Sequence, residues 1–161
     1  MLEFKLVKVR KPDDVNTVLG QSHFIKSVED LYECLVGNVP GIKFGVAFAE
    51  SSGACKIRSE GNDPDLKRLA EENALEIGCG HSFIIFMKEA YPINVLNAIK
   101  GIPEVCNIYC ASANPLEVVV AETESGRGIM GVIDGLKPQG LETAEDIAWR
   151  GKFLRTIGYK R

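Results

Sequence analysis

The sequence has no hydrophobic run long enough to cross a membrane, and residues 1–5 lack the apolar core of a signal peptide. Its five cysteines are an odd number without any Cys-x-x-Cys pair, which argues against a disulfide framework. Basic residues are not in excess, since 19 lysines and arginines stand against 22 aspartates and glutamates, for a net charge of −3. These absences predict a cytoplasmic protein that binds neither membranes nor nucleic acid.

Two common site signatures are missing as well. There is no Gly-x-x-x-x-Gly-Lys-[Ser/Thr] segment, which excludes a P-loop. The chain has only two histidines, and neither has a zinc-ligand partner at the usual spacing. The pair Cys79-x-His81 alone is weak evidence for a zinc site. Cys79 and His81 would also be badly placed for cysteine catalysis, because neighbours on one strand rarely reach thiolate–imidazole geometry.

What remains is the composition of an ordinary globular protein, with 45% hydrophobic and 25% charged residues, and 161 residues suit a single domain over 1–161. Apolar periodicity and turn signals predict the order ββαββαβαβββα. Strands are predicted over residues 3–10, 15–20, 42–50, 54–58, 83–87, 105–111, 116–123 and 128–133. Helices are predicted over residues 27–36, 64–77, 92–99 and 143–157. Because hairpins alternate with crossovers, we expect an α/β fold with a mixed β-sheet covered by helices.

Details of three elements carry further expectations. Ser27 with Asp30 fits a capping box for the first helix. On the strand at 42–50, glycine and alanine alternate with large residues, so another backbone or a subunit should pack closely on the small side. The last helix should turn Ile147, Gly151, Leu154 and Ile157 inward.

The segment from Ile77 to Met87 organises the chain. Phe83 to Met87 is an unbroken apolar run, which is typical of a strand buried on both faces near the middle of a sheet. His81 comes just before this strand. The nearby Gly78 and Gly80 have no side chains, so a bulky group could approach the backbone closely there. An imidazole can act as a base, nucleophile or ligand at neutral pH, so His81 is the leading catalytic candidate. The alternative is a structural histidine.

Other candidates are weaker. His23 precedes a helix whose backbone N–H groups could hold an anion, although it could equally serve only the helix start. In residues 125–135 glycines would let backbone amides approach a phosphate that Arg127 neutralises, although a hairpin turn explains most of this run. Asp134 at a strand end could bind Mg²⁺ or take a proton from a hydroxyl. Equally, Asp134-Gly135 could be an ordinary turn. The candidates for nucleotide contacts are Glu50, Ser52, Gly53, Asn62, Ser112, Asn114, Gly126, Arg127, Gly128 and Gly131.

Five blocks in a fixed order closely resemble the prokaryotic adenosine-specific kinase family, formerly a domain of unknown function. They are Gln-Ser-His-Phe-Ile-Lys-Ser-Val-Glu-Asp-Leu (21–31), Gly-His-Ser-Phe (80–83), Tyr-Pro-Ile-Asn-Val-Leu (91–96), Ala-Asn-Pro (113–115) and Gly-Ile-Met-Gly-Val-Ile-Asp-Gly (128–135). The resemblance runs from about Gly20 to Tyr159. It implies an α/β homotrimer that binds adenine nucleosides and nucleotides and moves phosphate from ATP to adenosine.

The resemblance also implies a stable phosphohistidine, which we assign to His81 with His23 as the rival. On this hypothesis MgATP lies with its phosphates against the 126–131 backbone and Arg127, and His81 accepts or holds the γ-phosphoryl group. Asp134 binds Mg²⁺ or accepts the 5′-hydroxyl proton, while Asn114 and Glu50 contact base or ribose. The alternative is a regulatory module that binds adenine nucleotides at the same cleft without turnover.

Overall fold

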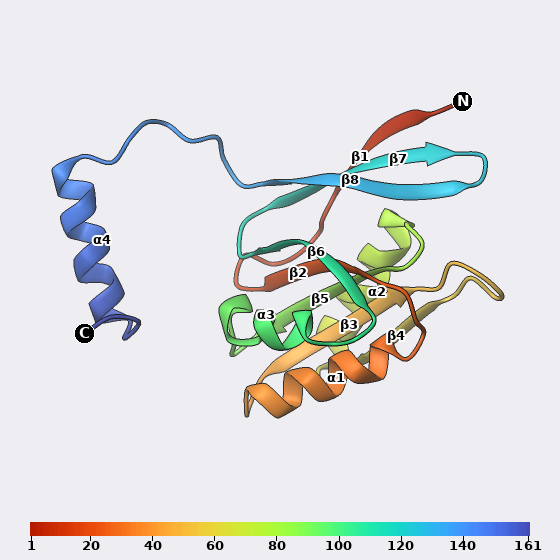
Figure 1. The fold of residues 1–161 in the computed structure, drawn as a ribbon, viewed down its shortest axis with the longest axis horizontal. Coiled ribbons are helices and arrows are strands. Elements are labelled where there is room, and N and C mark those ends of the chain that lie inside the picture. The colour runs from red at the N-terminus through yellow and green to blue at the C-terminus, as the bar shows by residue number, and fades with distance from the viewer.

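The computed structural model describes all of residues 1–161, and its elements follow the predicted order ββαββαβαβββα (Figure 1). The strands are β1 (Glu3–Lys8), β2 (Asn16–Ser22), β3 (Lys43–Ala49), β4 (Ile57–Gly61), β5 (Ser82–Lys88), β6 (Val105–Ser112), β7 (Leu116–Thr123) and β8 (Gly126–Asp134). The helices are α1 (Ser27–Asn38), α2 (Pro64–Ile77), α3 (Pro92–Lys100) and α4 (Ala144–Thr156). The α/β class is confirmed. None of the four helices has the length and hydrophobicity needed to span a membrane.

The strands form two antiparallel sheets in place of one mixed sheet. One has five strands in the order β4-β3-β5-β2-β6, and the other has three in the order β1-β7-β8. The crossovers through α1 and α3 do join parallel strands, but each pair of parallel strands is separated by an antiparallel neighbour. β5 lies between β2 and β3, and β2 lies between β5 and β6, which is the split βαβ arrangement. Sequence order does not reveal this interleaving.

β5 is the middle strand of the five-stranded sheet, as its unbroken apolar run predicts. Every residue from Ser82 to Met87 is buried. One face of the sheet packs against α1 and α3 through a cluster that includes Phe44, Phe83 and Leu31. The other face packs against α2 and the inner side of β7, through a cluster that includes Phe86 and Val118. The molecule is therefore layered, with the three-stranded sheet on top (Figure 1).

Local chemistry explains why α2 lies where it does. Asp63 caps its first turn by accepting from two backbone N–H groups, and Gly78 ends it in the left-handed conformation. Gly45 lets the helix backbone reach β3, since a Cβ there would lie 2.2 Å from the Lys67 nitrogen. The expected close backbone on the small side of this strand is confirmed.

Two local expectations were wrong. The return strand β4 starts at Ile57 and not at Ala54, because residues 51–56 form an exposed turn. The Ser27–Asp30 capping box does not form, since Lys26 is the N-cap residue and no side chain caps it.

The last helix differs most from expectation. Thr143 and Asp146 form the predicted cap, yet no residue of α4 is buried. A nine-residue connection after β8 carries α4 away from the body of the molecule (Figure 1). Ile147, Leu154 and Ile157 therefore do not face the core of their own chain.

Candidate functional site

One end of the five-stranded sheet brings both histidines together. β2 and β3 end there, while β4, β5 and β6 begin there. The Ser22 N–H donates to the His81 carbonyl at 2.9 Å, and the next residue's N–H, that of His23, donates to the Glu104 carbonyl at 3.0 Å. We call this region the histidine end: His23, His81, Glu50, Arg58 and Glu104.

His81 lies in a strained backbone conformation. Its φ of 63° is left-handed, which is uncommon for a residue with a side chain. The conformation is held from both sides, because the His81 N–H donates to the Ala49 carbonyl at 2.7 Å while its own carbonyl accepts from Ser22. Its half-buried ring stacks on Phe48, with centroids 5.8 Å apart and planes 16° from parallel. The ring therefore lies on the α1 side of the sheet.

The glycines beside His81 have structural uses and do not leave the approach open as expected. Gly78 ends α2, and a Cβ on Gly80 would lie 2.6 Å from the Ser51 Cβ. The loop after β3 fills the space beside Gly80. Access to the imidazole must come from the α1 side.

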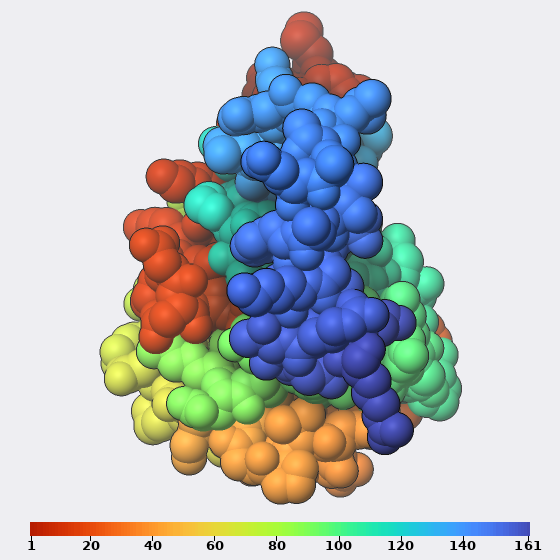
Figure 2. All heavy atoms as spheres, turned by 90° about the vertical axis from the view of Figure 1, so that its left-hand side faces the viewer, coloured from red at the N-terminus to blue at the C-terminus, as the bar shows by residue number.

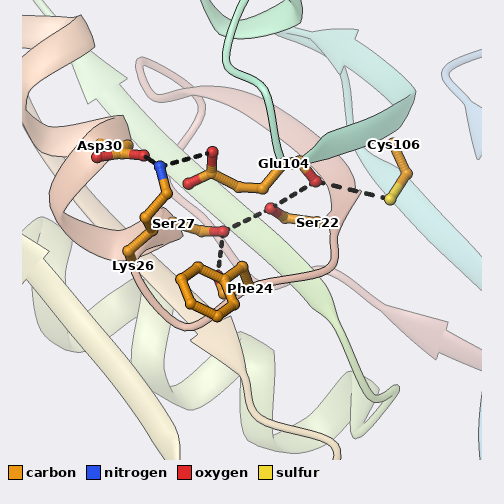
Figure 3. A network of polar contacts seen from close by, with 7 residues as sticks. All are labelled: Ser22, Phe24, Lys26, Ser27, Asp30, Glu104 and Cys106. Carbon is orange, nitrogen blue, oxygen red and sulfur yellow. Dashed lines mark hydrogen bonds and ion pairs between the residues drawn. The ribbon is translucent and has the colours of Figure 1, made fainter.

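A polar network anchors the start of α1 to β6 (Figure 3). Ser22 Oγ contacts Ser27 and donates to the Glu104 carbonyl at 3.0 Å. Lys26 Nζ lies 3.1 Å from Glu104 Oε2 and also pairs with Asp30. The Asp30 and Glu104 oxygens raise the pKa of Lys26, and its ammonium holds the pKa of Asp30 below the usual range. The loop that carries His23 is thus fixed at both ends.

Glu104 is an unusual member of this network. Its side chain is only 2% exposed, and its Oε1 has no hydrogen-bond partner. A buried carboxylate oxygen without a donor is costly, so it calls for a functional or solvent partner. The sequence contains no signal for Glu104, because only the pairing of β2 with β6 brings it to His23.

Arg58 carries the second unpartnered group of the histidine end. Its Nη2 donates to both oxygens of Glu50, at 3.3 and 3.2 Å, while its buried Nε has no acceptor. The Lys56 backbone N–H, followed by Arg58, lowers the pKa of Glu50, which therefore stays ionised. Arg58 thus has a free, directed N–H beside a fixed carboxylate.

A hollow of about 540 Å³ lies between the first turn of α1 and β4. Its volume is within the range of small-molecule sites. Its lining residues are Ile25, Lys26, Val28, Glu29, Ile57, Arg58, Ser59 and Glu60. Lys26 and Arg58 line this hollow together with the carboxylates of Glu29 and Glu60, and the first turn of α1 directs the positive end of its helix dipole toward it.

Three other candidates meet at the opposite end of the sheet. Asp134 Oδ1 accepts from Ser112 Oγ at 2.6 Å and from Asn114 Nδ2 at 3.0 Å. Ser112 ends β6, whose first residue pairs with Ser22 beside the histidines. Seven steps of about 3.3 Å along β6 separate the two ends by about 23 Å. Within one chain, Asp134 and His81 do not share a cleft.

The guanidinium of Arg127 is occupied by hydrogen bonds within the chain. It donates to Glu122 at 2.7 Å and to the Glu76 and Ile77 carbonyls at 3.0 and 3.4 Å, so it completes the end of α2. Gly126, Gly128 and Gly131 lie along β8, with open space where a Cβ would be.

The remaining candidates and the cysteine thiols add no reactive group to the histidine end. Ser52 and Gly53 lie in the exposed turn after β3, and Asn62 is occupied by backbone groups of Ile42 and Phe44. Burial raises the pKa of the Cys79 and Cys110 thiols to about 11, so neither is a thiolate at neutral pH. No group of three or more His, Cys, Asp or Glu side chains could hold a metal ion.

A family model described as "Adenosine specific kinase" matches residues 7–160. The crystal structure of the PH1918 protein from Pyrococcus horikoshii OT3 superposes with a TM-score of 0.96 at 48% sequence identity, covering 100% of this chain and 99% of that one. No curated protein matches the sequence.

Proposed function

The chain belongs to the adenosine-specific kinase family, and on that premise we propose that it transfers the γ-phosphoryl group of ATP to adenosine at the histidine end. The observation that carries this proposal is the meeting of two histidines at one end of the sheet with Arg58, which also lines the hollow beside α1. We further propose a cytoplasmic homotrimer, as the family resemblance implies.

Arg58 and Lys26 are suited to hold the phosphates. The Arg58 side chain lines the hollow, so that a phosphate there could accept from its guanidinium. Lys26 and the first N–H groups of α1 lie on the other side of the hollow. In phosphoryl transfer, positioning and charge neutralisation of this kind supply most of the rate.

The nucleoside would lie beside exposed apolar side chains. Phe24 and Ile25 are 50% and 45% exposed, and Ile25 lines the hollow. An adenine ring can stack on such groups, while the ionised Glu50 can accept a hydrogen bond from a ribose hydroxyl.

His81 is the proposed acceptor of phosphate. Its unprotonated ring nitrogen attacks the γ-phosphorus as the bond to the β,γ-bridging oxygen breaks and ADP leaves. The 5′-oxygen of adenosine then takes the phosphoryl group and releases its proton, which regenerates imidazole and forms AMP. His23, which is exposed at the same end of the sheet, is the rival acceptor.

Mg²⁺ at the histidine end would lie far from Asp134. Mg²⁺ is often held by one or two carboxylates together with substrate phosphates, so the absence of a three-ligand protein cluster is compatible with entry as MgATP. Glu50 is the carboxylate that fits this role at the histidine end, because Arg58 and Lys56 hold it ionised. Asp134 is about 23 Å away in the same chain, too far to bind this Mg²⁺ or to take the hydroxyl proton.

Chromatography of ATP, ADP, AMP and adenosine during incubation with the purified protein tests the proposal. We expect AMP to appear in step with ADP, and only when adenosine is present. Replacing Arg58 by alanine should raise the KM for ATP at least about tenfold, because a charge-assisted contact to phosphate is lost. Arg68→Ala is the matched control, since Arg68 pairs with Asp65 on exposed α2. Binding of ATP without any AMP would favour the regulatory module.

A further inference from the structure

His81 lies at the end of a short linker that two glycines make flexible. Only Gly78, Cys79 and Gly80 separate it from Ile77, the last residue of α2. Glycine samples more backbone conformations than any other residue, so this linker does not fix the imidazole by itself. A strained conformation such as the left-handed backbone of His81 persists only where its surroundings determine it from several directions. The linker therefore needs an anchor at α2 as well as one in the sheet.

A β-turn over residues 79–82 locks the second half of the linker. The Ser82 N–H donates to the Cys79 carbonyl at 3.2 Å, and the Ser82 hydroxyl donates to the same oxygen at 2.7 Å. His81 is the third residue of this turn, a position where the positive φ of a type II turn is usually met by glycine. A movement of Cys79 is therefore passed on to the imidazole.

Cys79 is anchored in turn through the last carbonyls of α2. It is 2% exposed, and its thiol donates to the Ile77 carbonyl at 3.5 Å. Arg127 Nη1 donates to the same carbonyl at 3.4 Å and to the Glu76 carbonyl at 3.0 Å. These two oxygens belong to the last turn of a helix, where the helix itself offers them no backbone N–H. Arg127 therefore fixes the end of the linker that the sheet does not hold.

Arg127 belongs to a different sheet from His81. It lies on β8 of the three-stranded sheet, which forms the top layer in both views of the molecule (Figure 1 and Figure 2). Its Nε donates to Glu122 at 2.7 Å, and Glu122 also pairs with Lys5 at 2.7 Å. Lys5 and Arg127 hold the pKa of Glu122 below its usual range, so this carboxylate is charged at neutral pH. One carboxylate therefore orients the guanidinium and leaves its Nη1 to α2.

We propose that Arg127 is a positioning residue for His81, because it holds the end of α2 and, through Cys79, the turn that presents the imidazole. This inference rests on the proposed function, in which His81 receives the γ-phosphoryl group. It assigns Arg127 to the acceptor and not to the phosphates of ATP, since its donors are directed at Glu122 and at backbone carbonyls. Misplacing a reacting group by about 1 Å can cost about a hundredfold in rate.

Steady-state kinetics separate positioning from phosphate binding. In Arg127→Gln we expect kcat and kcat/KM for ATP to fall by the same factor, between about tenfold and a hundredfold, with KM unchanged. Arg127→Lys should recover part of the loss, because an ammonium can still donate to one carbonyl. Lys5→Gln is the matched control, since it breaks the other ion pair of Glu122 without a contact to α2, and its kcat should equal that of the unaltered protein. An unchanged kcat in Arg127→Gln, or a rise in KM as the main effect, would overturn the inference.

NMR of the imidazole rings tests the positioning without any need for turnover. The chain has only two histidines, so the signals of His81 and His23 can be followed separately. In Arg127→Gln the His81 signals should shift because its stacking on Phe48 changes, while unchanged His23 signals show that the variant is folded. His81 signals that do not shift would overturn the inference even if AMP is formed. Shifted His81 signals in a protein that never forms AMP would refute the proposed function and still support the positioning of His81 by Arg127.

Discussion

Replacing His81 by asparagine should abolish phosphoryl transfer while leaving the fold intact. Asparagine tolerates the left-handed backbone that His81 adopts at φ 63° better than most residues do. It cannot act as a nucleophile toward phosphorus as imidazole does. The substitution therefore removes the chemistry without forcing the strained backbone to change.

The cost in stability follows from the contacts of His81. The ring stacks on Phe48 at 5.8 Å, and aromatic pairs contribute about 0.5–1.5 kcal/mol beyond their buried area. The backbone hydrogen bonds to Ala49 and Ser22 do not involve the side chain and remain. The free energy of unfolding should therefore fall by about 1 kcal/mol, out of the roughly 5–15 kcal/mol typical of a domain. Nearly all molecules stay folded, so unfolding cannot account for a large loss of activity.

The assay follows incorporation of label from γ-labelled ATP into protein, together with formation of AMP. We expect His81→Asn to lose the acid-labile label and to reduce turnover at least about a thousandfold. His23→Asn is the matched control at the same end of the sheet, and it should retain the label. Retention of label in His81→Asn together with its loss in His23→Asn would refute the assignment. Loss in neither variant would refute a histidine intermediate altogether.

Two further predictions concern stability. Gly45→Ala should lower the free energy of unfolding by about 3 kcal/mol, because the new Cβ would lie 2.2 Å from the α2 backbone. Gly37→Ala, in helix α1 with no atom within 4 Å of the new Cβ, should raise it by up to about 1 kcal/mol. Urea unfolding of the two variants measures both changes. Acid should destabilise the protein through Glu50 and Glu122, whose folded-state pKa values lie below 4.5. Their contribution is complete above a pH of about 4.5 and is lost as the pH falls through the folded pKa values, so a melting temperature that does not fall there would contradict this account.

Much of the fold could be predicted because it depends on local patterns. The apolar run at Phe83–Met87 marked the central strand, and the residues flanking α2 marked both of its ends. The order of strands within the sheets could not be predicted, since a crossover helix has the same pattern whether it returns to a neighbouring strand or to the next but one. The start of β4 was missed because contacts of Glu50 with Lys56 and Arg58 decide where the turn ends.

The α4 prediction failed for an informative reason. The residues expected on the inner side of this helix do not coincide with the exposed aromatic pair of Trp149 and Phe153, and no residue of α4 is buried. Periodicity cannot show whether the connection before a helix lets it reach the body of the chain, and here residues 135–143 carry α4 away from it. The assumption that a helix packs on its own body was therefore the error.

Some residues of the candidate site could be predicted from the sequence and others could not. Both histidines could be selected from the sequence because His23 directly follows a strand and His81 directly precedes one, positions that sequence reveals. Glu104 and Arg58 were missed as site residues, because strand pairing and not sequence distance brings them to His23 and Glu50. Conversely, the glycine-rich sequence around Arg127 led to its prediction as a phosphate-binding residue. In the structure it donates to the Glu76 carbonyl at the C-terminal end of α2.

Three features of this chain that break local rules occur at the histidine end, while the left-handed backbone of Glu89 and the unpartnered hydroxyl of Thr17 lie at the opposite end of the sheet. The three are a left-handed histidine, a buried carboxylate oxygen without a donor and a buried guanidinium N–H without an acceptor. Each costs free energy that the rest of the fold must offset, and a sequence selected only for stability would remove them by single substitutions. Their presence at one end of the sheet is explained if a bound nucleotide supplies the missing partners. Asp134 lies outside this group, because its Oδ1 accepts from Ser112 and Asn114 at the opposite end of the sheet.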